Sequence, residues 1–268
     1  MATREAWVWG TIAALTAGVL GSGCAVDASC LTPRPDEETA CDIVDAGTEW
    51  RFVNGQPLPD IEPFCSSRCV DFPGTLTLDG QHDLRKVPLL PKLRKVDRLI
   101  INVAGLPDLR GLERVDIGTL LHIGSYGVGA PDLTFASMTG LEDDAIDVVT
   151  VSRTPGLTSL GDSIRKATTI SLEDTGLVSL DLENVSVDYL SVFGSKDLRS
   201  ISLGSGTMES IWIDANPALE TLTWGELRAR SIRISRNPRL SSCQVSRFVQ
   251  DAGAAAGLTT VLDNGPCP

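Results

Sequence analysis

The chain has 268 residues, of which 42% are hydrophobic and 5% are aromatic, and its formal net charge is −12. This length suffices for one sizeable core or two modest domains, and the hydrophobic content argues against a wholly disordered chain. The acidic balance argues against a DNA- or RNA-binding role, because nucleic-acid binding needs a basic face. Only two histidines are present, which leaves little material for histidine-based catalysis or for a zinc site.

The N-terminus has the features of an export signal. Arg4 precedes an apolar run from Ala6 to Leu20, shorter than the roughly 20 residues that a membrane-spanning helix needs. We therefore expect residues 1–23 to be a signal peptide and the mature chain to contain no transmembrane span.

The small residues before Cys24 resemble a bacterial lipobox, in which this cysteine is lipidated, although Leu20 lies four residues before it rather than three. Under this resemblance Ala25 implies sorting to the bacterial outer membrane or the cell surface through a lipid anchor. The alternative is secretory cleavage after residues 26–28, which removes Cys24 and leaves a secreted or periplasmic protein.

Both processing routes leave an even number of cysteines behind an export signal, which predicts disulfides. These cysteines are Cys30, Cys41, Cys65, Cys69, Cys243 and Cys267. We expect the last two to pair and to close a loop of about 25 residues, worth roughly 3–4 kcal/mol. The pairing of the first four stays open. Zinc binding through Cys65 and Cys69 is the alternative, but export disfavours it, and we expect no metal.

The centre of the chain is built from eight similar segments. Each reads apolar-x-apolar, a polar or Gly/Pro turn, and then Leu-x-x-apolar, with a recurrence of roughly 20–28 residues. The first part has the period of a strand with one buried face and is rich in β-branched residues. The second apolar residue of each strand, its anchor, is found at Leu78, Ile101, Ile123, Val151, Leu172, Val192, Ile213 and Ile234.

One such coil cannot bury its apolar face alone, whereas stacked coils pair their strands in parallel and share one interior. Segments of about 21 residues cannot hold two helices plus turns, so helical repeats are disfavoured. We predict a mainly β fold over residues 72–241, a right-handed parallel β-helix or leucine-rich-repeat-like solenoid of about eight coils.

A polar residue follows most anchors by three positions. Short polar side chains there can bond nearby backbone N–H groups, so stacked coils should form an inward ladder that belongs to the fold. Its members are Gln81, Thr154, Thr175, Ser195, Asn216 and Asn237.

The two ends need caps, because open solenoid edges invite aggregation. We expect the Cys-rich segment 24–71 to cover one end. Residues 242–268 should cover the other with a helix capped by Ser242, a last strand at 259–262 and the C-terminal disulfide.

The tandem coils, the segment SIRISRNPRLSSC at 231–243 and the closing helix resemble the receptor L-domain, the leucine-rich-repeat-like β-helix of insulin- and epidermal-growth-factor-type receptor ectodomains. Similar domains occur in exported bacterial lipoproteins. The resemblance covers about residues 65–268 and implies an architecture rather than an activity. A second L-domain, a furin-like module and a kinase are missing from this sequence, so the resemblance implies no receptor signalling.

Motifs for an enzyme are sparse. The sequence contains no Gly-x-Ser-x-Gly elbow, Walker loop or dinucleotide fingerprint, and we expect no cofactor. His82 in a turn and His122 at an outward strand position should both be solvated. The densest acidic run, Glu142-Asp143-Asp144, lacks the ligand spacing of known calcium loops and is interpreted as a solvated turn.

The middle residue of each strand points outward, and these residues form a column: Thr77, Ile100, His122, Thr150, Ser171, Ser191, Trp212 and Arg233. Trp212 should be exposed beside Arg233, with Phe193 and Arg236 flanking them. Exposed aromatic residues and arginines are enriched in binding hot spots, so these four are the candidate ligand-binding residues. The competing interpretation is a local cation–π pair that covers the sheet and has no partner.

These observations predict a non-enzymatic envelope lipoprotein that binds a protein or a glycan through an exposed strand face. Two alternatives stay open: a polysaccharide-acting β-helix enzyme that uses clustered carboxylates, and a purely structural envelope component.

Overall fold

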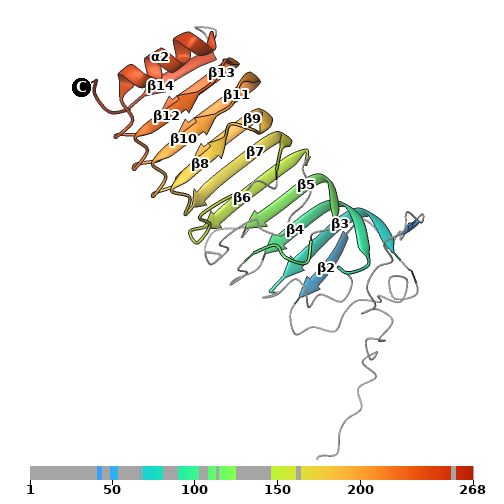
Figure 1. Cartoon of the computed structure of the whole chain (residues 1–268). Helices are drawn as coiled ribbons and strands as arrows, with labels where there is room; N and C mark the ends of the chain where they lie inside the picture. The colour runs from blue at the N-terminus through green and yellow to red at the C-terminus, as the bar shows by residue number, and fades with distance from the viewer. Residues whose placement is uncertain are drawn as a thin grey trace, which may run out of the picture.

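The chain forms a parallel β-solenoid in the computed structural model (Figure 1), which describes residues 41–43, 49–53, 67, 69–80, 90–102, 108–112, 115–124, 146–160, 164–254 and 258–267. The strands are β1 Asp42–Ile43, β2 Glu49–Val53, β3 Val70–Asp79, β4 Leu93–Asn102, β5 Asp116–Gly124, β6 Val148–Thr154, β7 Lys166–Thr175, β8 Ser179–Leu182, β9 Ser186–Phe193, β10 Ser200–Leu203, β11 Gly206–Asp214, β12 Thr221–Trp224, β13 Leu227–Ser235 and β14 Thr259–Leu262. A helix, α2, spans Ser242–Ala252. The expected mainly β solenoid is thus confirmed.

Two parallel sheets form the walls of the solenoid. The long sheet runs β1-β3-β4-β5-β6-β7-β9-β11-β13-β14, with β2 also on β3, and the short sheet runs β12-β10-β8. All eight expected anchors lie in strands of the long sheet. The structure makes about six turns, however, rather than the expected eight. The difference arises in the N-terminal half, where the segments between strands are longer and no strand of the short sheet occurs among the described residues.

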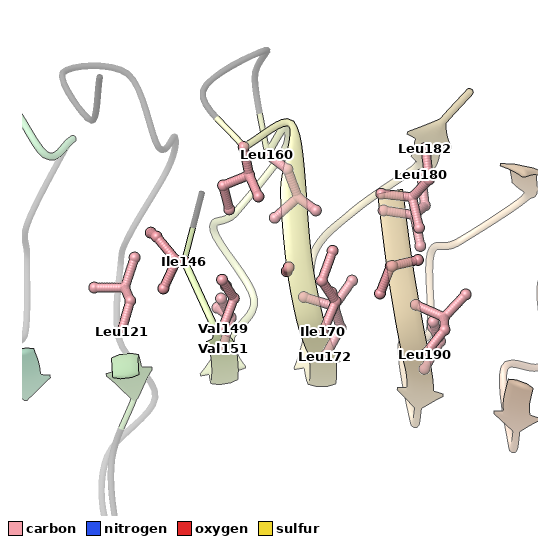
Figure 2. Packing of buried hydrophobic residues seen from close by; sticks show 14 of the residues in the cluster. Leu121, Ile146, Val149, Val151, Leu160, Ile170, Leu172, Leu180, Leu182 and Leu190 are labelled. Atoms are coloured by element: carbon pink, nitrogen blue, oxygen red, sulfur yellow. The ribbon is translucent and has the colours of Figure 1, made fainter. Parts of the chain in front are cut away.

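The interior is a continuous apolar stack. The anchors are fully buried, and leucines from the turns and from the short sheet meet them from the other side (Figure 2). In Figure 2, Leu160, Leu180 and Leu182 point into the same interior as Ile170 and Leu172. Each such side chain contributes roughly 1.5–3 kcal/mol when it is fully buried, and neighbouring coils supply the burial for one another.

The inward polar ladder is also confirmed. Ser195 N–H donates to Asn216 Oδ1 at 3.0 Å, and Asn216 N–H donates to Asn237 Oδ1 at 3.0 Å. Thr175 and Ser195 share a hydroxyl bond of 2.8 Å, and Asn264 continues the ladder beyond Asn237. The residue before each step takes a left-handed backbone that turns the next side chain inward, for example at Arg236, where φ is 56°. Thr154 is fully buried at the matching position, and Gln81 lies outside the described residues.

The C-terminal end is closed largely as expected. Helix α2 buries Val245, Phe248 and Ala252, and β14 pairs in parallel with β13. The N-cap is Ser241 rather than the expected Ser242, because residue 241 still has an extended backbone and residue 242 is already helical.

A disulfide is present near each end of the solenoid. Cys243 and Cys267 form the expected disulfide, with their Cα atoms 5.2 Å apart. Cys41 pairs with Cys69, which resolves one of the open pairings and removes Cys69 as a zinc ligand. Cys24, Cys30 and Cys65 lie outside the described residues, as does the expected signal peptide. Across the described ranges, no helix has the length and apolarity to cross a membrane.

Candidate binding face

The four candidate ligand-binding residues come together near the C-terminal end of the long sheet, where β9, β11 and β13 lie side by side (Figure 1). Trp212 pairs across the strands with Arg233 on one side, and Asp214 pairs with Phe193 on the other. Adjacent strands are about 4.8 Å apart, so side chains from one coil can contact those of the next. Arg236 follows directly after β13. We call Phe193, Trp212, Arg233 and Arg236 the aromatic–arginine patch.

The patch contains two cation–π contacts. The Arg233 guanidinium carbon lies 4.9 Å from the centre of the Trp212 ring, and that of Arg236 lies 5.9 Å from the centre of the Phe193 ring. The local pairing of Trp212 with Arg233, given above as the competing interpretation, is therefore present. It does not bury the indole, because Trp212 remains 41% exposed. A contact of this kind at an exposed site is worth about 0.5–1 kcal/mol.

The buried carboxylate of Asp214 binds Arg236 of the patch, and sequence reasoning missed it. Its carboxylate is fully buried and accepts bonds from Arg236 Nε at 2.8 Å, from Arg236 Nη2 and from Ser235 Oγ at 2.9 Å. The Arg236 bonds, more than the cost of burial, hold the pKa of the Asp214 carboxyl below its ordinary value of 3.8. The signal was available: Asp214 lies two residues after Trp212, hence on the same sheet face.

One arginine of the patch forms no ion pair with any described residue. Arg236 is neutralised by Asp214, whereas no ion pair of the described residues includes Arg233. Arg233 lies in β13, which carries three arginines and no acidic residue within a chain of net charge −12. The guanidinium of Arg230 in the same strand is engaged with Glu209 at 3.4 Å. The patch therefore presents one available cation beside an exposed indole.

A third exposed aromatic residue extends the face. Tyr189 is 45% exposed and lies two residues before Ser191 in β9, while Phe193 lies two residues after it. Since Ser191 also pairs with Trp212 on β11, aromatic side chains surround this small residue on three sides. The same alternation that identified Phe193 could have identified Tyr189.

The outward column divides into a hydroxyl-lined part and a covered part. Thr150, Ser171 and Ser191 are half-buried and lie in register on consecutive strands of the long sheet. His122 is only 3% exposed, so the expectation that it is solvated is wrong. The four consecutive residues Leu121–Gly124 are all buried, which shows that both faces of β5 are covered here. Desolvation lowers the pKa of His122 from 6.5 to about 4, although a backbone hydrogen bond with Gly124 partly opposes it.

The remaining candidate sites from the sequence give no chemistry in the described part of the chain. His82 and the acidic run at 142–144 lie outside it. No group of three or more His, Cys, Asp or Glu side chains that could hold a metal ion occurs among the described residues. A cavity of about 630 Å³ lies at the start of β8, where Arg165, Asp181 and Asn184 contribute polar groups and no aromatic side chain lines it.

Comparisons with known proteins place no relative beside this chain: no protein-family model, no curated protein and no solved structure matches it.

Proposed function

We propose that this protein is a non-enzymatic recognition module of the cell envelope, held by a lipid on Cys24, that binds a protein or a glycan through the outer face of its long sheet. The parallel β-solenoid supports this proposal, since its stacked coils present side chains at fixed spacing. The two disulfides fit an oxidising compartment outside the cytosol.

The observation that carries the proposal is the exposure of Trp212 beside Arg233. Six large hydrophobic residues are exposed in the described part of the chain, and two of them, Tyr189 and Trp212, lie on neighbouring strands of one sheet face. Trp, Tyr and Arg are the residue types most enriched in binding hot spots. The buried Asp214 carboxylate fixes the Arg236 guanidinium before any ligand arrives, which reduces the entropy lost on binding.

Photo-crosslinking on intact cells tests this proposal. A photoreactive amino acid replaces Ser191, and adducts are compared between the otherwise unchanged chain and its Trp212→Ala variant. We expect a discrete adduct that disappears with Trp212→Ala and persists with Val178→Ala, a control that truncates a side chain 49% exposed elsewhere in the molecule. Adducts that are unchanged by both substitutions would refute binding through this face and favour a structural envelope component or a carboxylate-based enzyme instead.

A further inference from the structure

The outer face of the long sheet offers a hydroxyl-lined track that leads to the aromatic–arginine patch. Thr150, Ser171 and Ser191 supply one hydroxyl side chain per strand, and Trp212 and Arg233 continue the same column. With strands about 4.8 Å apart, the track rises in even steps along the solenoid axis. A ligand that follows it crosses the strands rather than running parallel to them.

The pairing of the strands argues against a peptide that adds to the sheet. Peptides commonly bind by adding a strand to an exposed edge, where backbone groups are free. Here β9 is paired with β7 and β11, and β11 is paired with β9 and β13, so neither strand has a free edge. Any ligand of this face must therefore use side-chain contacts from above.

The side chains of the face fit a sugar polymer. Because Arg233 occupies one face of the indole, the exposed surface of Trp212 is the rest of the ring, which can pack against the apolar C–H face of a pyranose. Ser171 and Ser191 can each donate and accept hydrogen bonds with sugar hydroxyls. Glu173, exposed and paired with Phe193 in the sheet, adds an acceptor on the next strand.

The charges of the face indicate where along the ligand an anionic group should lie. Arg233 has no carboxylate among the described residues and is the available cation at one end of the track, and a guanidinium binds a carboxylate through two parallel hydrogen bonds. The negative charge of Glu173 lies nearer the other end, so it disfavours a second anionic group there. The ligand should therefore place an anionic group at Trp212 and Arg233, and neutral hydroxyl groups over Ser171.

We infer that the face binds an acidic glycan that contains uronic acid residues. One sugar ring lies on Trp212, its carboxylate pairs with Arg233, and the chain continues over Ser191 and Ser171. This inference rests on the proposed binding function and specifies the class of its partner.

Calorimetric titration of the mature chain, in buffer without divalent cations, tests the inference. The probes are two hexamers with one terminal uronic acid on neutral sugars (glucuronic acid on a glucose chain and galacturonic acid on a galactose chain), the methyl ester of each, and polyglutamate. We expect at least one of the two acidic hexamers to bind. We expect each methyl ester, which keeps the stereochemistry but lacks the charge, to bind at least tenfold more weakly than its parent hexamer if that hexamer binds.

Three variants locate the site. Trp212→Ala and Arg233→Gln should each weaken binding at least tenfold, whereas Arg230→Gln, which removes another exposed arginine of β13 that is already paired with Glu209, should change it less than twofold. Far-UV circular dichroism establishes that each variant is folded, and Arg233→Gln removes an exposed charge without leaving a cavity.

The inference is wrong if neither acidic hexamer binds, or if a methyl ester binds as tightly as its parent. It is also wrong if Trp212→Ala and Arg233→Gln both leave the affinity unchanged, or if polyglutamate binds as tightly as the hexamers. If these results coincide with a Trp212-dependent crosslink to a protein on cells, the proposed binding function stands and only the glycan is wrong. If the crosslink is also missing, both fail.

Discussion

The substitution Asp214→Asn tests whether one buried carboxylate holds the aromatic–arginine patch together. The amide keeps the size of the side chain but loses the charge, and its NH₂ group must face donors from Arg236 and Ser235. Loss of one partner of a fully buried ion pair costs about 3–5 kcal/mol. Because the Arg236 side chain is 54% exposed and can be rehydrated, we expect a smaller loss in the free energy of unfolding, about 2–3 kcal/mol.

Urea unfolding followed by tryptophan fluorescence measures this loss. The matched control is Glu209→Gln, which removes another carboxylate of β11. The ion pair of Glu209 with Arg230 is exposed, so this change should lower the free energy of unfolding by less than about 0.5 kcal/mol. Since the pKa of Asp214 is lowered in the folded state, its contribution is present above the unfolded value of 3.8 and is lost as the pH falls through the folded value. The difference between the parent chain and Asp214→Asn should thus be constant from pH 5 to 8 and should shrink below about pH 4. If Asp214→Asn is no more destabilising than Glu209→Gln, the carboxylate does not organise the patch.

Three further predictions concern the solenoid itself. Replacing Cys243 and Cys267 with alanine should lower the free energy of urea unfolding by about 3 kcal/mol, and reductant should then have no further effect on this end of the chain. Asn216→Ala should destabilise by about 2–4 kcal/mol in thermal unfolding, because it leaves Ser195 N–H without its buried acceptor, whereas the exposed Asn184→Ala should change stability by less than about 0.5 kcal/mol. Because the pKa of His122 is near 4 in the folded chain, only the unfolded chain binds a proton there between pH 6.5 and 4. The free energy of unfolding should therefore decrease by up to about 3 kcal/mol as the pH falls through this window, and His122→Leu should abolish this dependence. An NMR titration midpoint near 6.5 would contradict the burial argument.

The solenoid could be predicted because each coil repeats the same residue types at the same positions. Alternation places each anchor inside, and the polar residue three positions later must turn inward to satisfy the next coil. Val192 and Ser195 illustrate the rule, since both are fully buried and Ser195 bonds the coils on either side of it. The number of turns was less predictable, because strand signals do not report how long the returning segments are.

The candidate site was predictable in its position but not in its internal contacts. Alternation placed Trp212 and Arg233 on one face, but the Asp214–Arg236 pair joins residues 22 positions apart on adjacent coils and depends on the exact register. His122 shows the opposite failure. Its strand position points outward, as expected, yet an outward position is exposed only where nothing covers that face, and alternation along one strand does not report such cover.

The outer column separates what the fold requires from what it leaves free. Ser171, Ser191 and Trp212 occupy the same position on successive strands, and the sheet continues unchanged through all three. Since small hydroxyl residues suffice for pairing at this position, the exposed indole of Trp212 is not needed to build the solenoid. Its truncation should therefore remove a ligand contact while the free energy of unfolding changes by less than about 1 kcal/mol, in contrast with the buried Asp214 of the same strand. An exposed indole that the fold does not require, beside an arginine without an ion pair among the described residues, is what a ligand-binding site is expected to present.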